Sequence, residues 1–175
     1  SGKLTTTFPR SVGQLPLFYN HLNTGRPDPD SHIFNRYASN YLDESNEPLY
    51  PFGYGLSYTD FVYGELQISS ETLPKNGELT VSVTVTNKGN YDGYETVQLY
   101  LRDIYAEVAR PMKELKGFER IFLKSGESRD VKFVITKDDL KFYNSELHYV
   151  YEPGEFDVMV GPNSRDVQTK SFQAE

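Results

Sequence analysis

The sequence contains no cysteine and no tryptophan, and only two of its 175 residues are methionine. Without cysteine it can form no disulfide, thiolate metal site or cysteine nucleophile. No window of 18 apolar residues occurs, so we expect no membrane-spanning helix and no membrane partner. The first residues, Ser1-Gly2-Lys3-Leu4, lack the apolar run of a signal peptide, and we therefore expect none in this chain.

The sequence is also short of basic residues. Lysine and arginine total 18 against 25 aspartate and glutamate residues, which gives a formal net charge of −7. A protein that binds a polyanion needs a basic face, because neutralising phosphates supplies most of the affinity. We therefore expect no nucleic-acid partner.

Aromatic residues are abundant, with 14 tyrosines and 11 phenylalanines. Both types fit the half-buried surface of a pleated sheet, whereas helix-rich proteins rely on alanine, leucine, glutamate and lysine. This composition argues against a helical bundle. The only helical turn that we expect covers residues 136–140, where Thr136 can cap the turn.

From residue 61 onward, apolar residues recur at every second position. The clearest segments are 79–86, 97–102, 131–135 and 156–160, and weaker ones cover 61–68, 113–122 and 166–172. Strict alternation is typical of strands with one buried face, and glycine-rich turns separate these segments. About seven short strands in this length predict an all-β fold, an antiparallel β-sandwich of the immunoglobulin or fibronectin type III kind. A β-barrel is the alternative.

Residues 1–60 differ from the rest of the chain. They contain six of the ten prolines, and Pro27-Asp28-Pro29-Asp30 resists both helix and sheet. Their apolar residues are too many for a solvated linker. We therefore expect an irregular N-terminal extension that packs on a surface outside this chain.

Few residues form a pattern that indicates catalysis or metal binding. His21, His32 and His148 lack the spacing of metal ligands, so we expect no metal and no cofactor. The adjacent acids Asp138 and Asp139 do not face each other on a helical turn, which excludes a shared-proton pair. Exposed tyrosines of the sandwich could stack on sugar rings, so a carbohydrate-binding module is a second hypothesis.

Two motifs resemble a known family. Residues 51–59 read P-F-G-Y-G-L-S-Y-T, and residues 110–118 read R-P-M-K-E-L-K-G-F. Together with residues 1–10 and 15–27, they resemble the C-terminal part of family 3 glycoside hydrolases, most closely the bacterial periplasmic β-glucosidase type. The resemblance implies three parts: residues 1–27 from the end of the second catalytic domain, a linker strap at 28–60, and a fibronectin type III-like domain at 61–175.

The same resemblance implies a function. In this family the catalytic aspartate and glutamate lie on domains that precede this region, so we expect no catalytic residue here. The chain then corresponds to an accessory domain that packs on the catalytic domains of a retaining β-glucosidase, an enzyme that removes terminal β-glucosyl residues from oligosaccharides. A periplasmic or secreted parent enzyme is implied as well. A module for protein–protein contact or homodimerisation of the parent is a third hypothesis.

One group of polar residues follows the implied last strand of the second catalytic domain. Ligands of open α/β sheets bind beyond the carboxyl ends of strands, which makes this group a candidate rim of the substrate cleft. The alternative, which we prefer, is that it pins the strap by hydrogen bonds. The candidates are Tyr19, Asn20, His21, Asn23 and Arg26.

Overall fold

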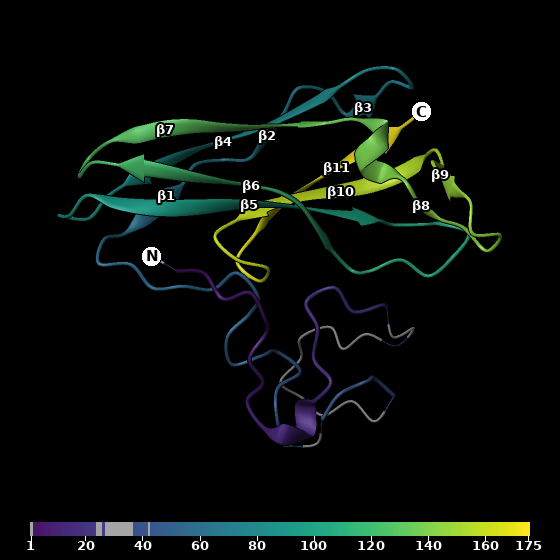
Figure 1. The fold of residues 1–175 in the computed structure, drawn as a ribbon, viewed down its shortest axis with the longest axis horizontal. Helices are drawn as coiled ribbons and strands as arrows, with labels where there is room; N and C mark the ends of the chain where they lie inside the picture. The colour runs from purple at the N-terminus through teal and green to yellow at the C-terminus, as the bar shows by residue number, and fades with distance from the viewer. Residues whose placement is uncertain (1, 24–25, 27–36, 42) are drawn as a thin grey trace.

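The computed structural model describes residues 2–23, 26, 37–41 and 43–175. The Pro27–Asp30 stretch and His32 lie outside these ranges. Figure 1 shows two layers of strands, with an irregular N-terminal region to one side of them. No helix in the described residues is long and apolar enough to cross a membrane.

The first sheet is built around β4 (Leu79–Asn87). On one edge it pairs with β1 (Phe61–Tyr63) and β2 (Gln67–Ile68), and on the other with β7 (Ser128–Ile135); all three pairings are antiparallel. The expected strand at 61–68 is thus two short strands along one edge of β4. Gly64 and Glu65 lie between them, where glycine weakens strand structure.

The second sheet has the order β3-β11-β10-β5-β6. Its strands are listed here: β3 (Thr72–Leu73), β5 (Gly93–Asp103), β6 (Glu114–Leu123), β10 (Gly154–Gly161) and β11 (Gln168–Ala174). Only the short contact between β3 and β11 is parallel. A separate hairpin joins β8 (Phe142–Tyr143) to β9 (Tyr149–Val150).

The core lies between the two sheets. Every second residue of β4 is buried, namely Leu79, Val81, Val83 and Val85, and β5 contributes Val97, Leu99 and Leu101. This confirms the predicted all-β sandwich, because the alternating positions face each other across the layers. In the described part of the chain the two sheets share no paired strand, so the barrel alternative is wrong. Each of the seven predicted segments contains strand, and β3, β8 and β9 add two-residue strands.

The described residues also contain two short 3₁₀ helices, one before the first strand and one between β7 and β8. η1 covers Val12–Gln14, and η2 covers Lys137–Leu140 at the expected helical turn. Thr136 precedes η2, and both its backbone N–H and its hydroxyl donate to the Asp139 carboxylate, at 2.8 and 3.0 Å. Asp138 instead pairs with Lys141. The two acids therefore act separately, as their spacing predicts.

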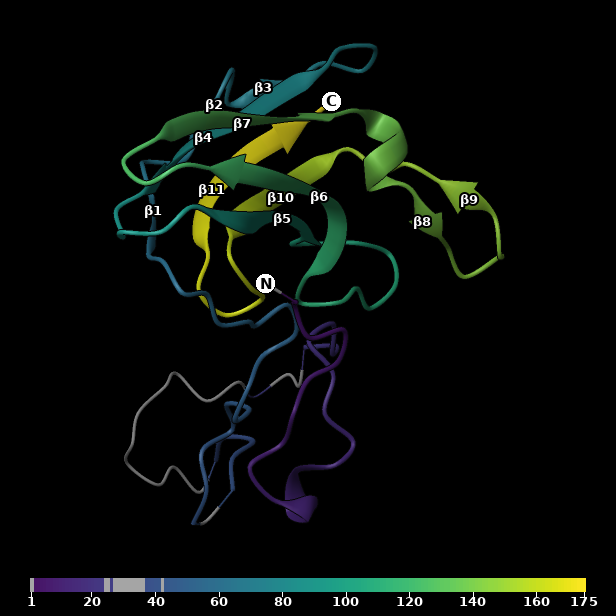
Figure 2. The same cartoon turned by 60° about the vertical axis from the view of Figure 1, so that its left-hand side comes forward.

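The N-terminal residues form an irregular layer outside the sandwich, which both views show (Figures 1 and 2). Residues 4–8 run alongside residues 50–54: Leu4 donates its N–H to Tyr54, Gly53 donates back to Leu4, and Phe8 bridges Tyr50. Gln14 is buried in this layer and donates from its amide to the carbonyls of Ser45 and Glu47. These contacts replace the strand ladders that the sequence of this region cannot form.

Candidate functional site

The candidate site lies where the N-terminal residues cover the outer face of the five-stranded sheet. Alternate positions of β5 point outward there, because their neighbours fill the core. Gln98 and Tyr100 lie on this outward face, yet they are only 3% and 0% exposed because the N-terminal layer covers them. The junction between the N-terminal layer and the five-stranded sheet therefore has a buried interior of its own.

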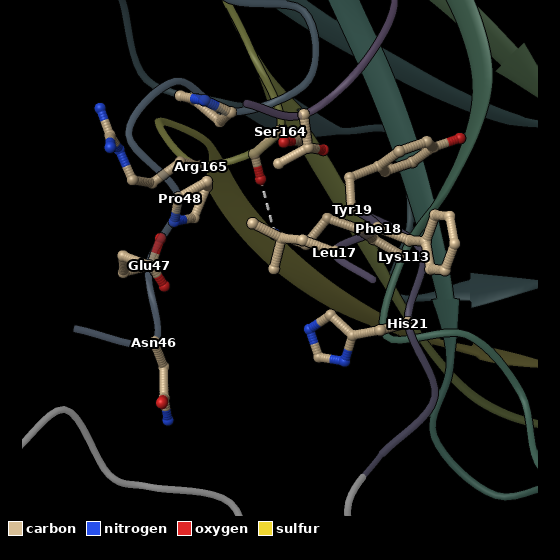
Figure 3. A pocket seen from close by; sticks show the side chains of 12 residues that line it. Leu17, Phe18, Tyr19, His21, Asn46, Glu47, Pro48, Lys113, Ser164 and Arg165 are labelled. Carbon is tan, nitrogen blue, oxygen red and sulfur yellow. Dashed lines mark hydrogen bonds between the residues drawn. The ribbon is translucent and has the colours of Figure 1, made fainter. Parts of the chain in front are cut away.

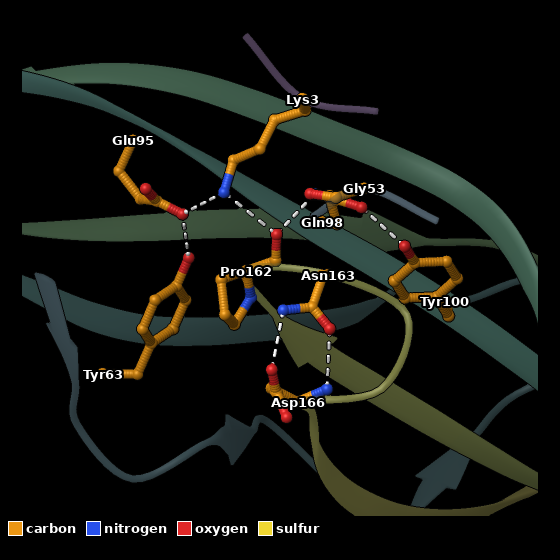
Figure 4. Close-up of polar contacts among 9 residues, drawn as sticks. All are labelled: Lys3, Gly53, Tyr63, Glu95, Gln98, Tyr100, Pro162, Asn163 and Asp166. Atoms are coloured by element: carbon orange, nitrogen blue, oxygen red, sulfur yellow. Dashed lines mark hydrogen bonds and ion pairs between the residues drawn. The ribbon is translucent and has the colours of Figure 1, made fainter. Parts of the chain in front are cut away.

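Gln98 connects three segments through its side-chain amide. The Nε2 group donates to the carbonyl oxygens of Gly53 at 3.2 Å and Pro162 at 2.7 Å, and Oε1 accepts from the Tyr100 hydroxyl at 2.5 Å (Figure 4). Both donor positions and the acceptor of this buried amide are used, which avoids the free-energy penalty of an unsatisfied polar group. The Gln98 amide thus joins the P-F-G motif, strand β5 and the turn after β10.

A buried ion pair lies beside this amide. The Lys3 ammonium is 3.0 Å from a Glu95 carboxylate oxygen and 3.1 Å from the Pro162 carbonyl oxygen, and the two side chains are 14% and 5% exposed. The Tyr63 hydroxyl donates to the same Glu95 oxygen at 3.0 Å. Burial, with the Glu95 charge next in importance, raises the pKa of Tyr63 well above its usual range, so Tyr63 stays a donor.

Gly53 passes very close to the sandwich. Its φ is +78°, and a Cβ atom there would lie 2.0 Å from Oε1 of Gln98. Both the left-handed backbone and the lack of space require glycine at this position. This gives a physical reason for the first glycine of the P-F-G-Y-G-L-S-Y-T motif.

The Tyr19 ring packs between Phe52 of the N-terminal layer and Tyr100 of β5. Its ring stacks on Phe52, with centroids 4.2 Å apart and planes at 20°, and meets Tyr100 edge-on at 5.9 Å. Its hydroxyl accepts from the N–H of Leu115 at 3.4 Å. Burial raises the pKa of Tyr100 above its usual range. Ring packing thereby holds the turns at Tyr19 and Phe52 against β5, and the hydrogen bond from Leu115 attaches Tyr19 to β6.

His21 contributes both its backbone and its side chain. Its carbonyl oxygen accepts from the N–H of Met112 at 2.8 Å, and Leu22 forms a bridge to Pro111. The imidazole is exposed, and its Nδ1 lies 2.9 Å from the Leu22 carbonyl oxygen. The backbone thus attaches residues 21–22 to the R-P-M-K segment, while the ring remains accessible.

A hollow of about 360 Å³ opens beside Tyr19 and His21. Figure 3 shows the His21 ring and Glu47 on opposite sides of it. Lys113 lines it as well and donates from Nζ to the Ser164 carbonyl oxygen at 2.6 Å. Burial lowers the pKa of Lys113, partly opposed by the nearby Glu47 charge. The remaining lining residues are Thr7, Leu17, Phe18, Asn46, Pro48, Pro51 and Arg165.

The other three rim candidates lie elsewhere. Asn20 and Arg26 are exposed, and the Arg26 carbonyl oxygen accepts from the N–H of Ser39 at 2.8 Å. Asn23 lines a second hollow, of about 270 Å³, next to Asp103 and Arg110. Tyr19 and His21 thus share one cavity, and Asn23 lines a different one.

The second hollow is lined by an unusual carboxylate. Both oxygens of Asp103 are buried and, like Nε of Arg110, have no well-aligned hydrogen-bond partner in the described residues, although the backbone N–H of Tyr105 interacts weakly with the carboxylate. Burial raises the pKa of Asp103 to about 6, although the Arg110 charge acts in the opposite direction. Sequence reasoning gave no sign of this residue, because a strand-end aspartate has no distinctive pattern.

Several residues of the junction were not singled out by their sequence pattern. Lys3, Glu95 and Gln98 appear in the sequence as ordinary polar residues of an extended segment and a strand, and Glu47 as one of many acids. Lys113, Lys3 and Gln98 lie in stretches that share the family resemblance, namely residues 110–118, 1–10 and 97–100. The resemblance assigns none of them a role, and their convergence with Glu95 and Glu47 follows only from the tertiary fold.

The N-terminal layer exposes many large apolar side chains. They are listed with the most exposed first: Tyr58, Val12, Leu56, Tyr37, Phe18, Leu15, Leu22, Phe8, Leu49, Tyr50 and Tyr41. Tyr58 is 97% exposed, although it lies in the P-F-G-x-G-L-S-Y-T motif. Contiguous exposed apolar surface usually marks an interaction site. In the described residues, no group of three or more histidine, aspartate or glutamate side chains converges as metal ligands would.

Comparison with known proteins identifies relatives over nearly the whole chain. Residues 95–164 match the fibronectin type III-like domain. The chain is 51% identical to a periplasmic β-glucosidase of Salmonella typhimurium over 99% of its own length and 22% of the relative, and 44% identical to a putative β-xylosidase of Formosa agariphila. The chain spans about a fifth of the length of these curated relatives.

Solved structures give the same result. A crystal structure of a β-glucosidase from Listeria innocua in complex with glucose superposes with a TM-score of 0.90 at 45% identity, covering 99% of this chain and 24% of the other. Because this match includes the N-terminal layer, the layer and the sandwich together correspond to one region of that enzyme.

Proposed function

Because the chain corresponds to a region of family 3 glycoside hydrolases that contains a fibronectin type III-like domain, we propose that it is the C-terminal accessory part of a retaining β-glucosidase. Its role is to pack on the catalytic domains and stabilise them. The parent enzyme removes terminal β-glucosyl residues from oligosaccharides and is periplasmic or secreted, as the name of the Salmonella relative suggests.

The observation that carries this proposal is the contrast in burial between the two regions. Both expose large apolar side chains, but the buried hydrophobic core consists of residues 61–175, whereas the described part of residues 1–60 leaves side chains such as Phe18, Leu56 and Tyr58 in solvent without a hydrophobic core of its own. Removing such surface from water stabilises a complex by roughly 25 cal/mol per Å². We propose that the catalytic domains of the same polypeptide cover this surface, with residues 1–27 as the end of the second catalytic domain and residues 28–60 as the strap.

The junction supports the same role from the other side. Gln98 and the Lys3–Glu95 pair hold the N-terminal layer firmly on the sandwich. Because this junction is rigid, the sandwich holds the N-terminal layer in a fixed position against the catalytic domains. Residues 61–175 thereby stabilise the catalytic domains of the parent enzyme.

The first test is enzymatic. We expect the chain alone to hydrolyse neither aryl β-glucosides nor aryl β-xylosides, because the catalytic aspartate and glutamate belong to other domains. The xylosides are included because three of the relatives are named β-xylosidases. Turnover that disappears when an acid of this chain is mutated would contradict the proposal.

The second test measures docking. The catalytic region of the Salmonella relative, produced without the segment that matches this chain, is mixed with the purified 175-residue chain, and binding is followed by calorimetry. We expect binding that weakens at least tenfold in the double variant Leu56→Ser and Tyr58→Ser. The matched control is Val134→Ser, an exposed apolar residue of β7 that is 53% exposed. Equal losses in both variants would contradict a docking surface on the N-terminal layer.

A further inference from the structure

The turn between β3 and β4 joins the two sheets at one end of the sandwich and has the sequence Pro74-Lys75-Asn76-Gly77. The N–H of Gly77 donates to the Pro74 carbonyl oxygen at 2.9 Å, which closes the turn, and the Asn76 side chain is exposed. Of the asparagines in the sequence, only Asn76 is followed by glycine. Because glycine has no Cβ, its backbone nitrogen can approach the preceding side-chain amide closely.

A lysine from another element lies beside this turn. β7 ends at Ile135, which pairs with Leu79 at the start of β4, so the residues after β7 lie next to the turn that precedes β4. The half-buried Lys137 begins η2 there, and its Nζ donates a long hydrogen bond of 3.5 Å to Oδ1 of Asn76. An ammonium group at a carbonyl oxygen stabilises negative charge that develops on that oxygen. The contact therefore makes the amide carbon of Asn76 more electrophilic.

We propose that Asn76 is a site of spontaneous deamidation through a cyclic imide, and that Lys137 promotes the reaction. The Gly77 nitrogen loses its proton to solvent hydroxide, and its electron pair forms a bond to Cγ of Asn76. The negative charge of the tetrahedral intermediate lies on Oδ1, next to the Lys137 ammonium. The bond between Cγ and Nδ2 then breaks, and ammonia leaves with a proton taken from water. Water finally opens the imide to aspartate or isoaspartate.

The local structure allows the turn to open for this reaction. Gly77 must release the Pro74 carbonyl oxygen before its nitrogen can turn toward the Asn76 side chain. Residues 74–76 are all exposed, and the preceding strand β3 pairs with β11 through only two residues. Exposed segments with few buried contacts open at a low free energy. Opening of this turn therefore leaves the core of the sandwich in place.

Two other places in the sandwich lack these conditions. Asn87 is 0% exposed, and its side-chain amide donates to two backbone carbonyl oxygens at 2.7 and 3.2 Å. The related dipeptide Asp92-Gly93 lies at the start of β5, where Gly93 pairs with Leu123 in the sheet. The Asp92 carboxylate accepts from the N–H of Ser125 at 2.9 Å. The fold thus restrains both alternatives and leaves Asn76 free to react.

The product changes the charge of the turn. The new carboxylate lies within reach of the Lys137 ammonium and forms an ion pair that links the turn to η2. A pair at an exposed position contributes little stability. The main consequence is one more negative charge on a chain whose formal net charge is already −7. Isoaspartate also lengthens the backbone by a methylene group.

The experiment follows the purified 175-residue chain by mass spectrometry during incubation at mildly alkaline pH. Trypsin cleaves after Lys75 and Lys88, so Asn76 and Asn87 lie in one peptide, and its fragment spectra distinguish them. We expect deamidation at Asn76 to be at least tenfold faster than at Asn87 in the folded chain, with isoaspartate among the products. Asn76→Gln should abolish the mass gain at this position, because the larger ring closes far more slowly.

A lysine variant separates the effect of the fold from that of the dipeptide. Lys137→Gln should slow deamidation at Asn76 at least threefold in the folded chain, and it should have no effect in urea, where the contact is lost. Thr136 and Asp139, which cap η2, are unchanged in this variant. The control Lys132→Gln removes the same charge from an exposed position of β7 and should leave the rate unchanged.

Two results would overturn the proposal. Equal rates at Asn76 and Asn87 in the folded chain would show that the turn does not select the site. A rate that Lys137→Gln leaves unchanged in the folded chain, or lowers equally in urea, would exclude the contact with Oδ1 as a cause. The reacting residues all belong to the sandwich, so these outcomes are separate from the docking experiment on Leu56 and Tyr58.

Discussion

Lys3 and Glu95 form a largely buried ion pair, with 3.0 Å between Nζ and Oε1. The pair joins the first residues of the chain to β5 of the five-stranded sheet. Their separation of 92 positions means that the pair forms only after both regions are folded. Removing one partner of a buried pair is costly, because the other charge is left without compensation.

The first prediction concerns this pair. Lys3→Met should lower the free energy of unfolding by about 2 kcal/mol, because the Glu95 carboxylate keeps only the Tyr63 hydroxyl as a partner. The double variant Lys3→Met and Glu95→Gln should recover at least half of that loss. Urea unfolding measures both values. A double variant that is less stable than the single one would show that the pair does not act as described.

The second prediction compares two glycines with the same φ of +78°. Gly126→Ala should cost about 1 kcal/mol, since a Cβ there meets nothing within 4 Å and only the left-handed backbone opposes alanine. Gly53→Ala should cost about 2 kcal/mol more, because the new Cβ displaces Gln98 and leaves buried polar groups unsatisfied. Thermal or urea unfolding of both variants gives the comparison, and equal losses would contradict the close packing of Gly53 on Gln98.

The third prediction concerns pH. The pKa of Asp103 is about 6 in the folded chain against an ordinary 3.8, so the folded state binds this proton more tightly than the unfolded state does. The stability contributed by protonated Asp103 is therefore present at low pH and is lost as the pH rises from about 4 to about 6. Asp103→Asn should stabilise the chain at pH 7.5 by about 1 kcal/mol, a value reduced for partial solvent access.

At pH 4 the same Asp103→Asn variant should be nearly as stable as the unmodified chain. Urea unfolding at the two pH values tests this difference, and the exposed Asp60 supplies the control variant Asp60→Asn. A gain in stability that is the same at both pH values would exclude the raised pKa as its cause.

The fourth prediction concerns the hairpin between β8 and β9. Leu147 has a φ of +62° and is 79% exposed, so it holds a left-handed backbone without burying its side chain. Leu147→Gly should stabilise the chain by about 0.5 kcal/mol, because relief of the strain exceeds the greater flexibility of glycine in the unfolded state. Leu147→Ala retains the strain and should give no gain. A gain from alanine equal to that from glycine would assign the effect to the lost side chain.

The strands were predictable because their signal is local. Because one face of β4 is buried, the apolar residues Leu79, Val81, Val83 and Val85 alternate with polar residues, and this period is visible in the sequence. The two-residue strands β3, β8 and β9 were missed because so short a run has no period. The break in the 61–68 segment was missed because a single glycine does not show where a strand ends.

The candidate site was predictable only in part. The position of Tyr19 and His21 in one cavity depends on how residues 16–22 fold back over β5 and β6, and Asn23 falls in a different hollow for the same reason. Glu47 and Lys113 are far apart in the sequence, and no periodicity relates them. Their opposition across one cavity is a property of the packed chain.

By itself, the sequence determined the all-β class, the order of the strands along the chain and the absence of thiol chemistry, because composition and alternation express burial directly. It also carried the motifs that relate the chain to glycoside hydrolases. Three relationships were decided only by the tertiary structure. Gly53 covers Gln98 and accepts its hydrogen bond, Lys3 pairs with Glu95, and Lys113 and Glu47 line the same hollow. These relationships join residues that meet only when the N-terminal layer packs on the sandwich.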